Sequence, residues 1–246
     1  MPDRPLAGQA ALVTGGAKRI GRAIALELAR AGAAVAFTYR HSREEALAVE
    51  QELQRFDVRA TGIQADLRLP AQARTAVAAA RATLGRLDLV VNNAGRYEEA
   101  AFEAISDEQW DEMMAVNLRA PFLVSREAAP ILRANGGGRI VNLGSVGGLK
   151  AFPTHAHYCA SKAGLAHLTR AMARALAPEI QVNAVAPGLI LFDPSPTAWE
   201  KSMAERTPMR RGGTPEEVAA TVRWFATCPA FITGQVLYVD GGLSLT

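Results

Sequence analysis

A serine, a tyrosine and a lysine lie within one stretch, Gly144 to Lys162, at a spacing that suits proton transfer. Tyr158 and Lys162 stand at positions i and i+4 of a run after Pro153 that is typical of a helix, so both side chains are expected on one helical face. A lysine ammonium beside a phenol favours the phenolate and lowers the tyrosine pKa from its usual value of about 10. Ser145 follows the apolar run RIVNLG, a predicted buried strand whose end can place the hydroxyl beside the phenol. The pattern predicts a general acid or base that works near neutral pH.

A glycine-rich turn near the N-terminus has the sequence context of a phosphate-binding loop. Residues 10–14 (AALVT) predict a short buried strand, and the run IGRAIALELARAG after the turn repeats apolar residues at helical spacing. Between them, Gly15, Gly16 and Gly21 let the backbone turn tightly and approach a pyrophosphate. The helix N-terminus then offers free N–H groups and the positive end of its dipole. Strand, glycine turn and helix together predict a dinucleotide site.

The rest of the chain alternates predicted strands with predicted helices. Further strands are expected over residues 33–40, 60–67, 87–95, 139–145, 180–188 and 232–242. Further helices are expected over residues 43–56, 70–84, 106–135 (broken near Pro121), 155–177 and 215–227. This alternation predicts a parallel sheet covered by helices on both faces. No internal repeat or domain boundary is visible, so one domain spanning residues 1–246 is expected.

Taken together, these features resemble the short-chain dehydrogenase/reductase family. The resemblance is carried by Ser145, Tyr158 and Lys162, by the glycine-rich start and by NNAG (residues 92–95), and it covers the chain from Ala10 to the C-terminus. It implies a doubly wound Rossmann α/β domain, with a seven-stranded parallel sheet in the order 3-2-1-4-5-6-7 and the site at the carboxyl ends of the strands. It also implies hydride transfer, in which the serine stabilises an oxyanion, the tyrosine delivers a proton and the lysine binds the nicotinamide ribose.

We assign expected functions to two further parts of the chain, Asn117 and residues 189–213. Asn117, in MMAVNLRAPF, matches the family's catalytic asparagine, which is thought to distort its helix and hold a water that links the lysine to solvent. A side chain that points to solvent is the alternative for Asn117. Residues 189–213 lack strand character and include three prolines, and such a long connection in a compact domain is usually functional. We therefore expect a substrate lid there.

The end of the second predicted strand carries no acidic residue. Dinucleotide folds that select NAD usually place an acidic side chain there to bond the ribose 2′-OH, whereas this chain reads Tyr39-Arg40-His41-Ser42. Arg40 and Ser42, helped by Arg19, can hold a 2′-phosphate through charge-assisted hydrogen bonds. Arg19 also replaces the middle glycine of the family's TGxxxGxG pattern. The sequence therefore predicts NADPH (NADP) over NADH as the cofactor.

The resemblance assigns further residues to the cofactor and the substrate. The expected cofactor contacts are Gly15, Lys18, Arg19, Ile20, Gly21, Tyr39, Arg40, Ser42, Asp66, Leu67, Asn93, Ala94, Gly95, Tyr158, Lys162, Pro187, Gly188 and Ile190. The expected substrate contacts are Tyr97, Ser145, Tyr158 and Leu189. Asp66 is equally well explained as a turn residue. Asn92 is expected to steady the central sheet.

The composition and the net charge limit the classes of binding partner that are expected for this protein. The formal charge of +3 is small and no long basic run occurs, which argues against nucleic-acid binding. Cys159 and Cys228 are too few and too far apart for a disulfide framework or a metal cluster, so no metal is expected. The polar start MPDRPLAGQ and the absence of a long apolar run favour a cytoplasmic enzyme without a membrane partner. The resemblance implies a homo-oligomer, a tetramer or a dimer, packed through helices 106–134 and 155–177.

The sequence leaves three functions to compare: ketone reduction and pterin reduction, which belong to two branches of the family, and NADPH sensing without catalysis. The complete Ser-Tyr-Lys set favours reduction of a ketone, as in 3-oxoacyl-[acyl-carrier-protein] reductases. The AKRIG loop, the runs TYRHS and PSPTAWE, the end GGLSLT and an aromatic ring at Tyr97 resemble pteridine reductases, which reduce a C=N bond. That branch carries an aspartate in place of Ser145, and ketone reductases usually carry a threonine in place of Phe192. A regulator that senses NADPH without catalysis is disfavoured, because such proteins commonly lose the tyrosine or the lysine.

Overall fold

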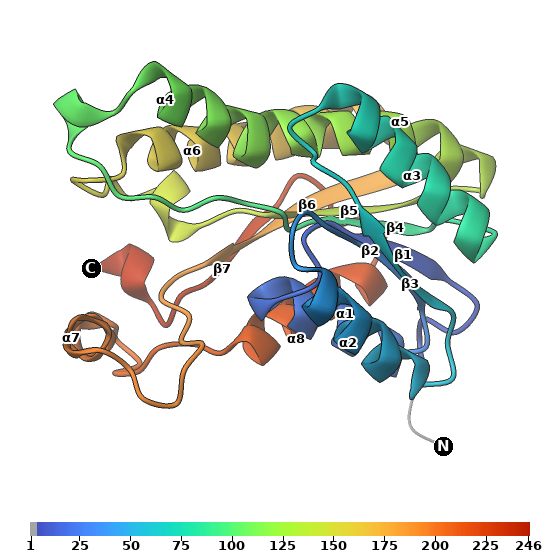
Figure 1. Cartoon of the computed structure of the whole chain (residues 1–246), viewed down its shortest axis with the longest axis horizontal. Helices are drawn as coiled ribbons and strands as arrows, with labels where there is room; N and C mark the ends of the chain where they lie inside the picture. The colour runs from blue at the N-terminus through green and yellow to red at the C-terminus, as the bar shows by residue number, and fades with distance from the viewer. Residues whose placement is uncertain (1–3) are drawn as a thin grey trace.

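A computed structural model describes residues 4–246 and shows seven parallel strands in a single sheet. The order β3-β2-β1-β4-β5-β6-β7 confirms the expected doubly wound topology (Figure 1). The strands are β1 (Ala10–Val13), β2 (Ala34–Tyr39), β3 (Ala60–Gln64), β4 (Leu89–Asn92), β5 (Gly138–Leu143), β6 (Ile180–Pro187) and β7 (Val236–Val239). The order reverses between β1 and β4, and a crevice at that point is the usual ligand site of such sheets. The first three residues of the polar start lie outside the described residues.

Helices cover both faces of the sheet, as the alternation predicts. Three of them lie on the lower side in Figure 1: α1 (Arg19–Arg30), α2 (Arg43–Gln54) and α8 (Pro215–Thr227). Four lie on the upper side: α3 (Pro70–Leu84), α4 (Asp107–Met114), α5 (Ala120–Ala134) and α6 (Ala156–Leu176). Each side encloses its own apolar core, with Leu28 and Phe225 in one and Leu84 and Leu132 in the other. Burial of these side chains fixes the helices and so positions the loops at the strand ends.

Several strands end earlier than the sequence predicts. Residues 87–95 predict one strand, but β4 stops at Asn92, and the segment Asn93–Gly95 leaves the sheet. Likewise β3 ends at Gln64 rather than at residue 67. In both places apolar or small residues continue past the last residue that pairs with a neighbouring strand, so the sequence pattern predicts a strand that is too long. The released residues are free to line the crevice at the carboxyl ends of the strands.

The helix is interrupted just before Pro121, close to the predicted break. The interruption is a π-helical turn at Ala115–Arg119, and α5 then begins at Ala120. Pro121 lies in the first turn of α5, which continues directly from this π-turn, and proline lacks the N–H that would bond to a carbonyl of the preceding turn. The π-turn places Asn117 in a fully buried position. Such single-turn bulges inside helices are frequent at functional sites.

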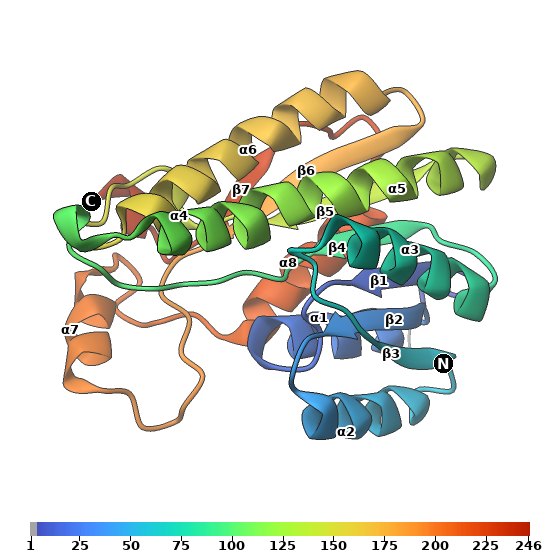
Figure 2. The same cartoon turned by 45° about the horizontal axis from the view of Figure 1, so that its top comes forward.

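The connection expected as a lid, residues 189–213, contains a helix that the sequence analysis missed. This helix, α7 (Ala198–Arg206), begins at a capping box in which Thr197 and Glu200 satisfy each other's backbone N–H groups. A bridge between Ile190 and Gly213 ties the two ends of the connection together. In both cartoon views α7 stands away from the sheet (Figures 1 and 2). Because α7 buries none of its residues, its packing gave little hydrophobic signal in the sequence.

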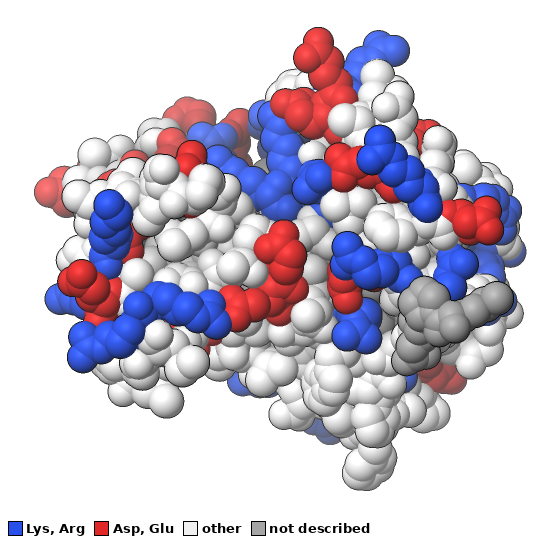
Figure 3. All heavy atoms as spheres, turned by 90° about the horizontal axis from the view of Figure 1, so that it is seen from below, with Lys and Arg blue, Asp and Glu red and all other residues white. Residues whose placement is uncertain are grey.

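The surface and the helices agree with the composition. On the face shown in Figure 3, basic and acidic side chains are interspersed, and basic ones gather around a hollow. Within residues 4–246, no helix combines the length and the apolar character that a membrane crossing requires.

A buried amide network joins the middle strands to the helices above them. The side chain of Asn92 on β4 donates to Asn142 of β5 (2.8 Å) and to Ser125 of α5 (2.9 Å). Asn142 in turn donates to the hydroxyl of Thr169 on α6 (2.9 Å). All four residues are almost fully buried. Asn92 therefore steadies the sheet beside the crevice, as expected.

Asn142→Ala should lower the free energy of unfolding by about 1–3 kcal/mol, because one amide hydrogen of Asn92 and one lone pair of the Thr169 hydroxyl lose their buried partner. Urea denaturation followed by circular dichroism measures the change. The control is Thr75→Ala, which removes an exposed hydroxyl bond on α3 and should change stability by less than about 0.5 kcal/mol. Equal stability of the two variants would show that the network contributes nothing.

Candidate active site at the carboxyl end of the sheet

The glycine turn after β1 is shaped for close approach by a ligand. Gly15 has a φ of +66°, a conformation that favours glycine. A Cβ on Gly21 would overlap the carbonyl oxygen of Gly15, so no side chain fits there. The side-chain amide of Asn93 donates to the carbonyls of Thr14 and Gly15 (2.9 and 3.0 Å) and holds the turn in place. The turn and the N-terminus of α1 thus form a cradle of backbone groups, and its binding of a phosphate stays a prediction.

Arg19 adds a charge to this cradle at the cost of backbone strain. Its φ of +51° is unusual for a residue with a Cβ, which explains why the family pattern has glycine at this position. The guanidinium lies over the ring of Phe192 at 5.2 Å from the ring centre. A non-glycine residue at positive φ persists where the surroundings over-determine it, and such residues cluster at functional sites.

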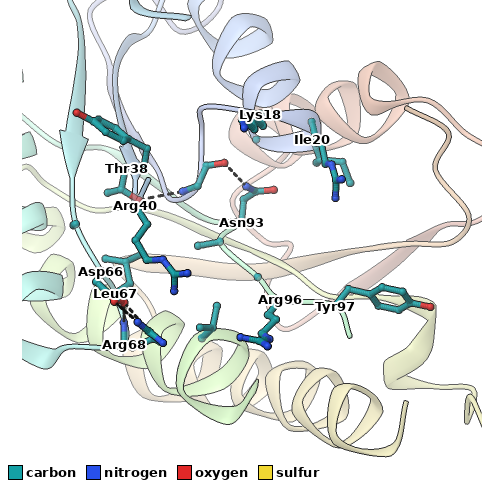
Figure 4. Close-up of a pocket in the computed structure, with 18 of the residues that line it drawn as sticks. Lys18, Ile20, Thr38, Arg40, Asp66, Leu67, Arg68, Asn93, Arg96 and Tyr97 are labelled. Carbon is teal, nitrogen blue, oxygen red and sulfur yellow. Dashed lines mark hydrogen bonds and ion pairs between the residues drawn. The ribbon is translucent and has the colours of Figure 1, made fainter. Parts of the chain in front are cut away.

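A cavity of about 600 Å³ runs along the strand ends beside this turn. Figure 4 shows Arg40, Asp66, Leu67 and Arg68 gathered at one end and Tyr97 at the other. The lining brings together these expected cofactor contacts: Gly15, Lys18, Arg19, Ile20, Gly21, Tyr39, Arg40, Asp66, Leu67, Asn93, Ala94 and Gly95. An elongated cavity with a glycine cradle at its middle suits a dinucleotide.

Eight expected contacts lie outside this lining. Three of them, Ser145, Tyr158 and Lys162, form the set described below, and the other five are Ser42, Pro187, Gly188, Leu189 and Ile190. Ser42 occupies the N-cap position of α2, where its side chain makes no capping bond. Pro187 ends β6, and the Gly188 N–H donates to the carbonyl of Val239 (3.0 Å). Leu189 follows, and Ile190 is buried against the core of α1 and α8. The position of this group after β6 agrees with the prediction, but its contact with a cofactor stays a prediction.

The sequence analysis missed six lining residues: Thr38, Ala65, Arg68, Arg96, Glu112 and Val116. Arg68 makes a bidentate ion pair with Asp66, with the closest atoms 2.6 Å apart, and also pairs with Glu112 at 2.5 Å. The hydrogen bonds from Arg68 lower the pKa of Asp66. Glu112 also pairs with Arg96, which directly follows Gly95. The position of Arg68 and Arg96 next to predicted contacts is the only signal that could have identified them.

Ser145, Tyr158 and Lys162 meet beside the Tyr97 end of the cavity. Ser145 follows β5, and its hydroxyl oxygen accepts the Gly147 N–H (3.0 Å), so its own hydrogen is free for another acceptor. The ammonium of Lys162 is buried, donates to the carbonyl of Leu143 (2.7 Å) and lies 5.9 Å from the centre of the Tyr158 ring. A Cβ on Gly95 would lie 3.6 Å from this ammonium, which places the set against the cavity wall.

The pKa values of this set correct the prediction made from the spacing. Burial raises the pKa of Tyr158 to about 12, although the hydroxyl of Ser145 lowers it in part. Burial lowers the pKa of Lys162 to about 8. A phenol pKa lowered by the lysine is therefore wrong for this structure, because desolvation outweighs the attraction between the two groups and the ammonium is directed to Leu143. The phenol is protonated at neutral pH.

Asn117 lies between the two halves of the site. Its side-chain oxygen accepts the Arg96 N–H (2.8 Å), and its amide donates to the Arg96 carbonyl (2.9 Å) and to the Ser161 hydroxyl (3.0 Å). The alternative of a side chain directed to solvent is wrong, since Asn117 has no exposed surface. Asn117 thus connects the segment after β4 to the helix that carries Tyr158 and Lys162.

Tyr97 contacts Tyr158 directly. Its ring meets the Tyr158 ring edge-on, with the centres 4.9 Å apart. Its face stacks on the ring of His155 at 4.5 Å. The Tyr97 side chain is 58% exposed and lines the cavity, so it is well placed for the substrate contact expected of it. Within residues 4–246, no group of three or more His, Cys, Asp or Glu side chains could hold a metal ion.

Known proteins resemble this chain in both sequence and fold. A family model described as enoyl-(acyl carrier protein) reductase matches residues 15–244. Over 240 residues the chain is 37% identical to the 3-oxoacyl-[acyl-carrier-protein] reductase of Staphylococcus aureus, a match that covers 96% of this chain and 98% of the relative.

Solved structures agree over the same length. A short-chain dehydrogenase/reductase from Serratia marcescens superimposes with a TM-score of 0.93 at 38% identity, over 98% of this chain and 99% of that one. A blue fluorescent protein from a metagenomic library, in complex with NADPH, gives a TM-score of 0.90 at 36% identity, over 97% and 99% of the two chains. The glycine turn, the cavity and the Ser-Tyr-Lys set therefore lie on a fold that this chain shares with known short-chain dehydrogenase/reductases.

Proposed function

The chain belongs to the short-chain dehydrogenase/reductase family, and from that membership we propose that it is an NADPH-dependent reductase of ketones in 3-oxoacyl thioesters. The observation that carries the proposal is the set of Ser145, Tyr158 and the buried Lys162 beside the end of a cavity with a glycine cradle. When bound, the nicotinamide supplies the hydride. The remaining steps belong to side chains of this chain.

Ser145 and Tyr158 act on the oxygen of the substrate carbonyl. Ser145 has a free hydrogen because its oxygen accepts the Gly147 N–H, and this hydrogen stabilises the oxyanion that develops as the carbonyl is reduced. Tyr158, with a pKa of about 12, is protonated at neutral pH and still a stronger acid than the alcohol product. Proton transfer from Tyr158 to the alkoxide is therefore favourable. The raised pKa supports the reducing direction.

Lys162 supplies positive charge beside the proton donor. With a pKa of about 8 it is mainly protonated at pH 7, although it is buried. Its ammonium has three hydrogens and one observed acceptor, the Leu143 carbonyl, so further hydrogens are available for the ribose hydroxyls of a cofactor. Asn117 and Gly95 keep the space next to it narrow and polar.

The basic end of the cavity supports NADPH as the cofactor. Lys18, Arg19 and Arg40 line it, and the acidic Asp66 is neutralised by its bidentate pair with Arg68. Lys18 pairs with Glu45 at 2.6 Å across a largely exposed surface, an interaction that a phosphate can replace. The excess of positive charge favours a 2′-phosphate over a free hydroxyl.

Reduction of a pterin is the second candidate, and the exposed Tyr97 ring is the observation that favours it. A ring that contacts Tyr158 at its edge can stack a flat heterocycle next to the proton donor. Ser145 in place of the aspartate of pteridine reductases favours the ketone.

We also propose that the protein is a cytoplasmic homo-oligomer. An apolar groove on the outer side of α4, α5 and α6 includes Leu118 and Leu168, and Phe122 is 42% exposed there. Light scattering in solution should give at least twice the 26.2 kDa of one chain, and the mass of a single chain would contradict the proposal.

Tyr158→Phe should reduce the rate of carbonyl reduction by at least about a hundredfold, because the proton donor is lost while the ring and its packing remain. NADPH oxidation followed by absorbance measures turnover, and fluorescence titration measures NADPH binding. Binding should change less than about twofold. Turnover near that of the wild type would refute the role of Tyr158.

The kcat/KM for ketone reduction should be level from pH 6 to 7 and decline as pH rises through about 8, the pKa of Lys162, because the ammonium then loses its charge. Lys162→Arg should remove the decline, since a guanidinium stays protonated throughout this range. Initial rates at subsaturating ketone, in buffers of constant ionic strength, measure both profiles. A profile that stays level to pH 10 in the wild type is the contrary result.

Arg40→Asp should lower the ratio of kcat/KM for NADPH to that for NADH by at least about tenfold, because a carboxylate repels the 2′-phosphate and accepts the 2′-OH. Arg43→Asp is the matched control: Arg43 is exposed on α2 and lies outside the cavity lining. Its ratio should stay within about twofold of the wild type. Equal effects of the two variants would contradict a specific role for Arg40.

A further inference from the structure

His155 is a buried histidine with one unsatisfied nitrogen. Only 7% of the residue is exposed, at the N-terminus of α6 and three positions before Tyr158. Its Nδ1 lies 3.1 Å from the hydroxyl of Thr154. Its Nε2 is buried and has no hydrogen-bond partner among residues 4–246. Buried polar atoms without partners are rare in folded proteins, so this nitrogen calls for an explanation.

The hydrogen bonds around Thr154 decide which nitrogen of His155 carries the hydrogen. The Thr154 hydroxyl donates its single hydrogen to the carboxylate of Glu99 (2.9 Å). Toward His155 it can therefore only accept, so the hydrogen of the neutral ring is on Nδ1. Burial lowers the pKa of His155, which favours this neutral form. The unsatisfied Nε2 is consequently a bare hydrogen-bond acceptor.

The surroundings of His155 connect it to the reacting end of the cavity. Its ring stacks on Tyr97, which touches Tyr158, and Phe152 meets it edge-on at 6.0 Å. The Ala100 N–H donates to the Thr154 carbonyl (2.9 Å), so the segment that carries Tyr97 and Glu99 is tied to the start of α6. Tyr97 is more than half exposed and its hydroxyl has no hydrogen bond among residues 4–246, so rotation of its side chain would uncover His155.

We propose that His155 is a substrate-recognition residue whose Nε2 accepts a hydrogen bond from a hydroxyl or N–H group that the substrate carries near its reacting carbonyl. The inference rests on the proposed ketone reduction and adds to it a substrate class, ketones with a neighbouring donor. The Glu99–Thr154 pair is the positioning element, because it holds the ring with the acceptor free. Tyr97 supplies a flat apolar wall beside the same group.

A site built around a bare acceptor discriminates by leaving that acceptor unpaired when the donor is missing. A ketone with the hydroxyl satisfies Nε2, whereas the same ketone without it leaves the nitrogen buried and unpaired. We therefore expect at least a tenfold preference for the hydroxyketone in kcat/KM, and the preference should depend on the acceptor, not on the bulk of the side chain.

The test compares 2-hydroxyacetophenone with acetophenone, which differ by one hydroxyl, as substrates for the NADPH-loaded protein. The quantity compared is kcat/KM for the hydroxyketone divided by kcat/KM for acetophenone. His155→Phe keeps a flat ring but removes the acceptor, so this ratio should fall to between about 0.5 and about 2. His155→Gln keeps an acceptor and should retain at least a threefold preference. Thr154→Val leaves His155 in place but removes the acceptor for Nδ1–H, and should also lower the ratio.

Each outcome decides the proposal. A wild-type ratio near one, or a preference that His155→Phe leaves unchanged, overturns it and assigns Nε2 to a buried water. If neither ketone is reduced, reduction of a 3-oxoacyl thioester tests the proposed function separately, and calorimetric binding of both ketones to the NADP-loaded protein tests His155 alone. Tighter binding of the hydroxyketone that is lost in His155→Phe then supports the proposal, and equal binding overturns it. If His155→Phe does not fold, Thr154→Val decides by the same criteria.

Discussion

The buried ammonium of Lys162 imposes the main constraint on the architecture of this site. A charged group inside a protein needs a partner, and Lys162 finds it in the carbonyl of Leu143, at the carboxyl end of β5. For this bond to form, the first turns of α6 must lie across the end of the sheet. Tyr158, one turn earlier on the same helix, is thereby placed beside Ser145, which follows the same strand. The catalytic geometry thus follows from satisfying one buried charge.

Burial shifts the pKa values of Tyr158 and Lys162 in opposite directions. It raises the pKa of Tyr158 to about 12 and lowers that of Lys162 to about 8, because each loses solvation of its charged form. The phenol therefore holds its proton at neutral pH, while the ammonium is less tightly protonated than usual. The π-turn and the carboxamide of Asn117 complete this enclosure by joining the segment after β4 to α6. A site with this arrangement is prepared to donate a proton.

Much of this architecture was predictable from the sequence because it rests on local patterns. Helix α3 has the predicted bounds, and the strand order follows from the alternation of elements and the family resemblance. The π-turn at Asn117 was not predictable, since one extra residue per turn barely alters hydrophobic periodicity. Glu112 and Val116 reach the cavity only through long-range packing. The direction of the Tyr158 pKa shift depends on desolvation, about which a spacing of four residues says nothing.

The most direct test of the whole account is NADPH oxidation by the wild-type protein with a 3-oxoacyl thioester and, separately, with dihydrobiopterin. We predict that the thioester is reduced. One 3-hydroxyacyl product should form for each NADPH consumed, as measured by chromatography and absorbance. Reduction of the pterin alone would contradict the assignment of Ser145 to a carbonyl oxyanion. In a further contrary result, the protein binds NADPH but oxidises it with neither compound nor with any other ketone tested. That result would contradict the proposal that this protein is a reductase.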